Sequence, residues 1–264
     1  MILIFANCQG GVIKKFLKSF LQNTEIIHII NYEEDNNLIK NLSKCSIFIY
    51  QNNGNKLKLI LNKLSKECKK ISIPYIFNDG IASLSYAPKS KKWGYGKIYG
   101  DEIIIDLINK NYSKEDIIEM FLNNQIDFNL GNRIKVSFDE LLKREKNIDI
   151  KIHSFIKDNY KSKNLFLTHN HPTTEVFKFV IIEILKILNI PYENIIDEII
   201  NVRQKNPGLD IPCYVLTPYD IEKNKLSYDY NKNWKRDGII LINLIYKHHN
   251  CLLYTSDAAD EEDS

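Results

Sequence analysis

Short apolar runs alternate with longer amphipathic stretches through the N-terminal third of the chain. The apolar runs are rich in β-branched and aromatic residues, which is typical of strands buried on both faces. The stretches between them place apolar residues at helical spacing. This alternation predicts an α/β fold, a three-layer sandwich with a mostly parallel central sheet. The predicted strands cover residues 2–5, 25–30, 46–50 and 71–77, and the predicted helices cover 12–21, 35–42 and 57–64.

The rest of the chain is richer in helix signals. We expect a single α/β domain over residues 1–250, with a helix-rich C-terminal half and a helical insertion around 101–160. Pro74 lies inside the fourth predicted strand and favours a place at the sheet edge or a bulge. The further predicted elements are a helix with a capping box at Ser113, a helix from Ser137 or Phe138, a strand over 164–168, a helix over 176–188 and a loop over 206–212.

The C-terminal segment differs in composition from the Ile/Asn/Lys-rich chain before it. Residues 251–264 read like the translation of a transposon-end adaptor used in sequencing libraries. We interpret them as a non-native tail and expect the native protein to continue beyond about residue 250.

Charge and cysteine usage exclude several classes of partner. The formal charge of +3 is too small to indicate nucleic-acid binding. Five widely spaced cysteines without a C-x-x-C pair predict neither a disulfide framework nor a zinc site, so we expect no metal and a reducing cytoplasm. The longest apolar stretch, 177–188, contains three charged residues, so we expect no membrane span. The sequence does not indicate an oligomeric state.

Cys8 lies where the first predicted strand gives way to the first predicted helix. The carboxyl end of a parallel strand is where α/β enzymes place reactive side chains, and the unpaired amides of a helix N-terminus favour a thiolate. Gly10 and Gly11 would let the backbone approach an anion or oxyanion. The alternative is that Cys8 is a small buried residue in a tight turn, and the local sequence leaves both open.

A second group of polar residues, His169, Asn170 and His171, follows the strand predicted over 164–168. A histidine with a near-neutral pKa, fixed by a neighbouring Asn170, can accept a proton from a thiol and return it to a leaving group. Ligation of a metal by the two histidines, or simple capping of the next helix by Thr168 to Thr173, are the alternatives.

Cationic residues for a phosphate-bearing ligand occur in two places. The loop over 83–100 combines aromatic residues with Lys89 and Lys92, which could hold phosphates while the rings stack on a base or sugar. Arg144 could clamp a phosphate or carboxylate, although an Arg next to Glu145 on a helix is more often a solvated pair.

Together these motifs resemble one known family. Asn7-Cys8-Gln9 after the first strand, Gln51 after the third, the Arg144-Glu145 segment and Asn170-His171-Pro172-Thr173 before a long apolar helix are similar to the polysaccharide-biosynthesis acetyltransferases of the WcbI type. The likeness spans residues 1 to about 220. Ala6 stands where a glycine is expected before Asn7, a mild departure from the pattern.

The resemblance implies a cytoplasmic protein of capsule or surface-polysaccharide assembly. It further implies binding of coenzyme A or acetyl-CoA as a co-substrate and acetylation of a sugar hydroxyl. By position, the catalytic residues would be Cys8, Gln9 and His171 with Asn170, and Gln51 and Arg144 would belong to the CoA site. From the local chemistry described above we add Gly10, Lys89 and Lys92 to the expected CoA site. Gln9 and the turn amides would stabilise an oxyanion.

Two other functions remain open. The turn geometry also looks like that of SGNH hydrolases, a flavodoxin-like fold in which Cys8 would replace the usual serine; an esterase or deacetylase would then use the same residues with water as acceptor. A non-catalytic CoA-binding protein would keep the ligand site without turnover. Every version needs Cys8 and His171 to lie together.

Overall fold

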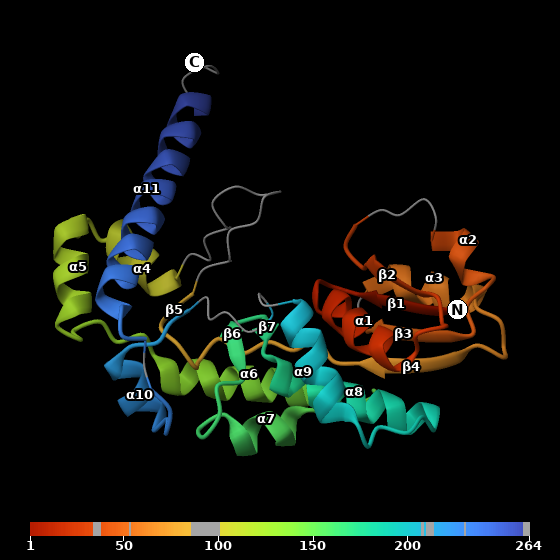
Figure 1. Cartoon of the computed structure of the whole chain (residues 1–264). Helices are drawn as coiled ribbons and strands as arrows, with labels where there is room; N and C mark the ends of the chain where they lie inside the picture. Colours follow the sequence, from red (N-terminus) through yellow and green to blue (C-terminus); the bar gives the residue numbers. More distant parts are fainter. Residues whose placement is uncertain are drawn as a thin grey trace. The chain divides into compact units, whose positions relative to one another are not determined.

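The computed structural model describes residues 1–33, 38–52, 54–85, 101–206, 209, 214–229 and 231–260, which form two compact units (Figure 1). The first unit comprises Met1–Phe77, Val136–Tyr160 and Asn164–Ile211, and the second comprises Asn78–Lys135, Lys161–Lys163 and Pro212–Ser264. The expected single domain over 1–250 and the expected non-native tail stay predictions. Lys89, Lys92 and most of the loop predicted over 206–212 lie outside the described residues.

The first unit is built on a four-stranded parallel sheet with the order β2-β1-β3-β4, which confirms the predicted α/β class. Every residue of β1 is buried, because this strand lies between β2 and β3 and is covered on both faces. In its register Ile4 lies opposite His28 of β2 and Ile49 of β3. The strands are β1 (Ile2–Ala6), β2 (Ile26–Ile30), β3 (Ile47–Gln51) and β4 (Lys69–Ile73).

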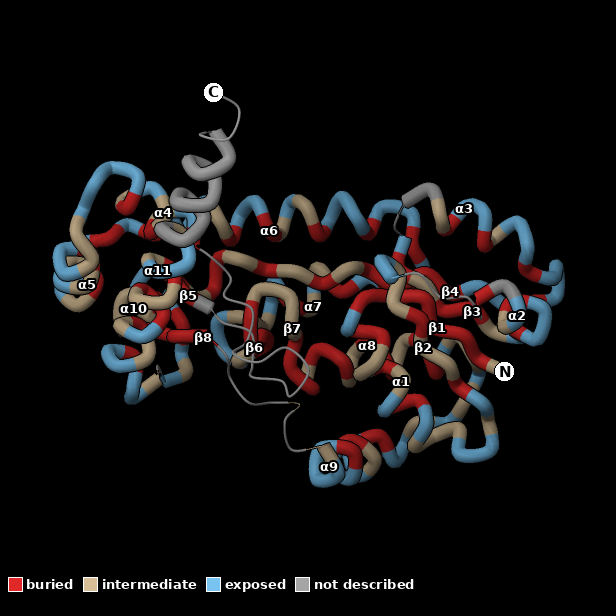
Figure 2. Tube along the Cα trace, turned by 90° about the horizontal axis from the view of Figure 1, so that it is seen from above, coloured by how far each residue is buried: buried red, intermediate tan, exposed pale blue. Residues whose placement is uncertain are grey.

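Helices cover both faces of this sheet. Leu3, Phe5 and Phe48 pack with side chains of α2 and α3 on one face. On the other face lies α1, and α8 and α9 pack against it. Figure 2 shows the buried strands between these helices. The helices are α1 (Gln9–Phe20), α2 (Leu38–Leu42), α3 (Gly54–Lys63), α8 (Thr174–Leu188) and α9 (Ile195–Lys205).

The edge strand β4 differs from its predicted bounds. It begins at Lys69 and ends at Ile73, because Pro74 has no N–H to continue the ladder. Its place at the end of the strand order confirms the edge position that Pro74 indicated. Ser72 donates its backbone N–H to the Asp149 carboxylate, and its backbone oxygen accepts from Ile150 N. The segment that contains Asp149 and Ile150 therefore supplies hydrogen-bond partners to part of the open edge of β4.

The strand predicted over 164–168 is shorter and lies outside the parallel sheet. It forms β6 (Phe166–Thr168), which pairs antiparallel with β7 (His171–Pro172) in a two-stranded ribbon. The helix predicted from Ser137 or Phe138 begins earlier, as α6 (Leu130–Arg144), and α7 (His153–Asn159) follows it. The apolar helix after His171 is confirmed as α8, with Thr173 as its N-cap.

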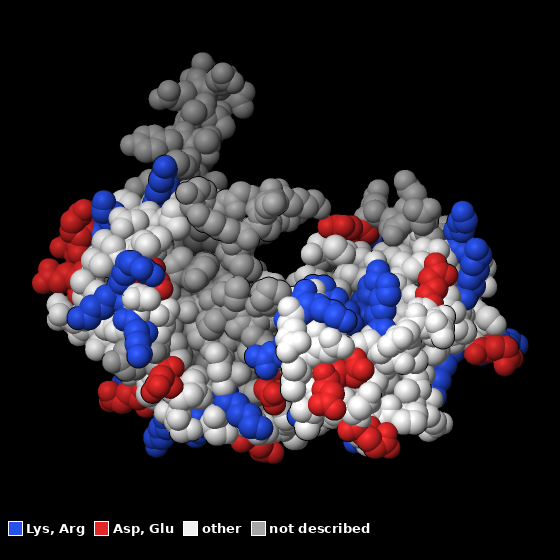
Figure 3. Space-filling model, in the orientation of Figure 1, with Lys and Arg blue, Asp and Glu red and all other residues white. Residues whose placement is uncertain are grey.

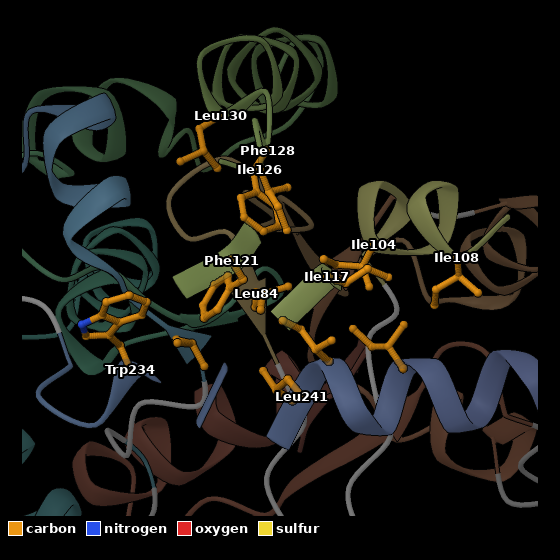
Figure 4. Close-up of a cluster of buried hydrophobic side chains, with 13 residues drawn as sticks. Leu84, Ile104, Ile108, Ile117, Phe121, Ile126, Phe128, Leu130, Trp234 and Leu241 are labelled. Atoms are coloured by element: carbon orange, nitrogen blue, oxygen red, sulfur yellow. The ribbon is translucent and has the colours of Figure 1, made fainter. Parts of the chain in front are cut away.

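The second unit is mainly helical around a compact apolar cluster (Figure 4). The rings of Phe121 and Trp234 pack edge to face at 5.4 Å. The predicted capping box at Ser113 is confirmed, with Asp116 as its partner. The elements are α4 (Glu102–Asn109), α5 (Lys114–Leu122), α10 (Pro218–Asn224), α11 (Trp234–Asp260) and the antiparallel pair of β5 (Leu84–Ser85) and β8 (Tyr214–Val215).

Charged side chains of both signs occur on the visible face of each unit (Figure 3). No helix within the described part of the chain combines the length and the apolar character that a membrane span requires.

Candidate active site

Cys8 occupies the turn between β1 and α1 and is exposed. Asn7 shapes this turn, because its side-chain oxygen accepts from Gln9 N at 3.0 Å and its backbone oxygen accepts from Gly10 N at 3.0 Å. The backbone N–H of Asn7 donates to Gln51 Oε1 at 2.8 Å. The thiol is thus held at the carboxyl end of the central strand of the sheet.

Gln9 is a buried connector between the Cys8 turn and the β6–β7 turn. Its side-chain nitrogen donates to Ile76 O at 2.7 Å and to Asn170 O at 2.9 Å. Its side-chain oxygen accepts from Gln51 Nε2 at 3.0 Å and from Ile76 N at 3.3 Å. Both side-chain amide protons of Gln9 are therefore in use, and the predicted oxyanion role of Gln9 would require one of these bonds to break.

Gln51 and Gly10 are likewise structural. Gln51 is only 2% exposed, and besides its bonds to Asn7 and Gln9 it donates to Pro74 O. A Cβ at Gly10 would lie 2.6 Å from the His28 ring, so the glycine is required for packing onto β2. The CoA contacts predicted for these two residues stay predictions.

The β6–β7 ribbon brings His171 to Cys8. His171 Nε2 lies 3.8 Å from Cys8 Sγ, within reach of an S–H···N hydrogen bond. On its other side His171 Nδ1 lies 2.6 Å from Thr168 Oγ1, and this hydroxyl donates to Asn170 Oδ1 at 3.0 Å. The expected meeting of Cys8 and His171 is confirmed, whereas Thr168 is a contact that sequence reasoning assigned only to helix capping.

The electrostatics of this pair differ from expectation. Desolvation raises the pKa of the Cys8 thiol above its ordinary 9.0, although the backbone amides of Cys8 and Gln9 act in the opposite direction. Desolvation also lowers the pKa of His171 below 6.5. Both shifts favour a neutral thiol beside a neutral imidazole over the thiolate that the helix N-terminus alone would favour.

Aromatic side chains lie next to the β6–β7 turn. The Tyr75 hydroxyl hydrogen-bonds the Asn170 side chain, and the Tyr75 ring stacks on Phe77 at 6.2 Å. Phe77 in turn contacts the His169 ring at 5.1 Å. His169 thus packs against Phe77, whereas His171 is the histidine that lies next to the thiol.

Arg144 is exposed and lies over the Tyr75 ring, with its guanidinium carbon 5.1 Å from the ring centroid. Of the three cations predicted to bind phosphates, Arg144 is the one within the described residues. It lies next to Tyr75, whose hydroxyl contacts Asn170. Glu145 is not its solvated partner, because the Glu145 carboxylate is buried and accepts from Ile152 N and His153 N at the start of α7. Within the described ranges, no cluster of His, Cys, Asp and Glu is suited to a metal ion.

The fold and these contacts define an α/β protein with a cysteine–histidine pair at the carboxyl edge of a parallel sheet. The family model described as "Polysaccharide biosynthesis enzyme WcbI" matches residues 1–193, so the chain belongs to the WcbI family of polysaccharide biosynthesis enzymes.

A solved structure described as WcbI, a novel polysaccharide biosynthesis enzyme, is similar over 95% of this chain and 94% of its own, with a TM-score of 0.65 and 17% identity. At this identity the likeness shows a shared fold. That structure is described as the native protein without a disulfide bond between coenzyme A and one of its cysteines. The comparison with curated proteins found no match.

Proposed function

We propose that this protein is a CoA-dependent acetyltransferase that acetylates a sugar hydroxyl during capsule or surface-polysaccharide biosynthesis. The observation that carries the proposal is the exposed Cys8 thiol with His171 Nε2 at 3.8 Å, because a thiol and a base in this arrangement can accept and pass on an acyl group. The family supplies the polysaccharide context. The description of the solved WcbI structure names coenzyme A together with a cysteine, and we assign the corresponding role here to Cys8.

In the first half-reaction His171 Nε2 takes the Cys8 proton while the sulfur attacks the carbonyl carbon of acetyl-CoA. The carbon–sulfur bond to CoA then breaks, and the imidazolium returns the proton to the leaving thiolate. We assign stabilisation of the transient oxyanion to the backbone N–H of Cys8, since the backbone N–H of Gln9 already donates to Asn7 Oδ1. The products are acetyl-Cys8 and free CoA.

In the second half-reaction a sugar hydroxyl gives its proton to His171 Nε2, and its oxygen attacks acetyl-Cys8. The sulfur leaves and recovers the proton, which restores the neutral pair. Because both half-reactions begin with a neutral imidazole, the depressed pKa of His171 suits the base role at neutral pH.

Arg144 is the described cation that we assign to the phosphates of CoA, with Lys89 and Lys92 as further candidates. Its guanidinium is exposed and lies beside Tyr75, whose hydroxyl contacts the Asn170 side chain. The free thiols of Cys8, Cys45 and Cys68 fit a reducing compartment, and we propose a cytoplasmic location.

Acetyl transfer from radiolabelled acetyl-CoA to a panel of sugars and sugar nucleotides tests this proposal. We expect labelled ester in the wild type and its loss in Cys8→Ser and His171→Gln. Full activity of Cys8→Ser would eliminate the covalent route and leave direct deprotonation of the sugar by His171. Hydrolysis of acetylated sugars without any need for CoA would instead identify an esterase, and CoA binding by calorimetry without turnover would identify a non-catalytic CoA-binding protein.

A further inference from the structure

A chain of side-chain hydrogen bonds leads from Tyr75 to His171. The Asn170 side chain contacts the Tyr75 hydroxyl, Asn170 Oδ1 accepts from Thr168 Oγ1 at 3.0 Å, and Thr168 Oγ1 lies 2.6 Å from His171 Nδ1. Thr168 is only 1% exposed, so bulk water does not replace these partners. The chain ends at His171 Nε2, which faces Cys8 Sγ.

The direction of each hydrogen bond follows from the protons available. Asn170 turns its oxygen to Thr168, which leaves its NH2 group to donate to the Tyr75 oxygen. The Thr168 hydroxyl has a single proton and gives it to Asn170. Thr168 Oγ1 can therefore only accept from His171, and the proton on the imidazole must reside on Nδ1.

We propose that Thr168 is a positioning residue that fixes His171 as the Nδ1–H tautomer, so that the Nε2 lone pair faces the Cys8 thiol. Its catalytic consequence rests on the proposed function, whereas the tautomer is a property of the free protein. In a Ser-His-Asp triad a carboxylate accepts the Nδ1–H bond and stabilises the imidazolium, whereas here the neutral Thr168 hydroxyl accepts that bond. Thr168 thus orients the base and does not turn the pair into a thiolate and an imidazolium.

The opposite direction of the chain would give the opposite tautomer. If Asn170 presented its NH2 group to Thr168, the hydroxyl would donate to His171 Nδ1, and Nε2 would carry the proton toward the sulfur. Such an imidazole could not accept the Cys8 proton. The two directions therefore differ in an observable of the resting protein and in its reactivity.

The test is long-range ¹H–¹⁵N NMR of the imidazoles in the full chain, assigned with His171→Gln. We expect His171 to show a protonated Nδ1 and an unprotonated Nε2 above pH 7. Thr168→Val should mix the tautomers, and Thr168→Ser, which keeps the hydroxyl, should restore the wild-type pattern. Thr173→Val is the matched control, because it removes another buried threonine hydroxyl of the same segment, one that donates to Asn164 O.

Reactivity gives a second readout. Thr168→Val should slow alkylation of Cys8 by iodoacetamide and acetylation by acetyl-CoA by about 10-fold or more, while Thr173→Val leaves both rates unchanged. A protonated Nε2 in the wild type, or an unchanged tautomer in Thr168→Val, would overturn the proposal. The wild-type spectrum tests the predicted tautomer even if Thr168→Val does not fold, and this result does not depend on acetyl-CoA being a substrate.

Discussion

Replacing Gln9 with leucine separates a positioning role from a catalytic one. The side chain is 2% exposed and makes four hydrogen bonds, to Ile76 O, Ile76 N, Asn170 O and Gln51 Nε2, at 2.7 to 3.3 Å. Leucine fills a similar volume but removes all four bonds; Gln51 Nε2 keeps its bond to Pro74 O, and each of the other three lost bonds costs roughly 1–3 kcal/mol if nothing replaces it. Because relaxation and entering water recover part of this cost, we expect a net loss of about 3–5 kcal/mol.

The assay is urea unfolding followed by far-UV circular dichroism, with amide exchange of β1 reporting on the first unit alone. Gln22→Leu is the matched control, because Gln22 is exposed in the same unit and its substitution should change stability by no more than about 0.5 kcal/mol. Gln9→Leu should lower stability and acetyl transfer together, since it releases the turn that carries Asn170 from the turn that carries Cys8.

An unchanged unfolding midpoint with a loss of roughly 10²–10³ in kcat would refute this reasoning. That pattern would mean that the side-chain amide of Gln9 is free in the reacting complex and donates to the oxyanion directly.

Three further predictions concern pH, packing and a buried carboxylate. Desolvation lowers the pKa of His171 below 6.5 and raises that of Cys8 above 9.0. The rate of Cys8 acetylation, measured in quenched time courses, should therefore be constant between pH 6.5 and 9.0 and fall only in more acidic solution. A fall in rate with its midpoint above pH 6.5 would contradict the neutral pair. Gly10→Ala should cost about 1–3 kcal/mol in chemical unfolding, because the new Cβ meets the His28 ring at 2.6 Å, and an unchanged midpoint would disprove this tight packing. Burial raises the pKa of Asp220 to about 6 from 3.8, so its contribution to stability is present below pH 3.8 and is lost as the pH rises through 6. Asp220→Asn should abolish this pH dependence of stability in thermal melts of the second unit. If the pH dependence survives in the variant, another group is its source.

The sequence was most informative where structure is local. Apolar runs and helical spacing predicted β1, α1 and α8, because burial on both faces of a strand and on one face of a helix leaves a periodic trace. The helix start at Leu130 was missed, since Gly131 and Asn132 are weak helix formers and hide it.

The candidate site was only partly predictable. Cys8 and His171 could be paired from their positions after strands, yet His171 reaches the thiol from an antiparallel ribbon and not from the parallel sheet. The parts played by Gln9 and Thr168 depend on partners far away in sequence or on hydrogen-bond direction, and neither leaves a periodic signal. Desolvation likewise raises the pKa of Cys8 against the effect of the Cys8 and Gln9 backbone amides, and this balance depends on groups that are distant in sequence.

Site-resolved mass spectrometry of acid-quenched protein after mixing with acetyl-CoA tests the central claim most directly. The account predicts one acetyl group on Cys8, formed without a sugar acceptor, removed when the acceptor is added, and greatly reduced in His171→Gln. Buried Cys45, whose pKa desolvation raises to about 12, is the internal control and should stay unmodified. Sugar acetylation with no acetyl-Cys8 at any time, or labelling of Cys8 no faster than of Cys45, would contradict the account.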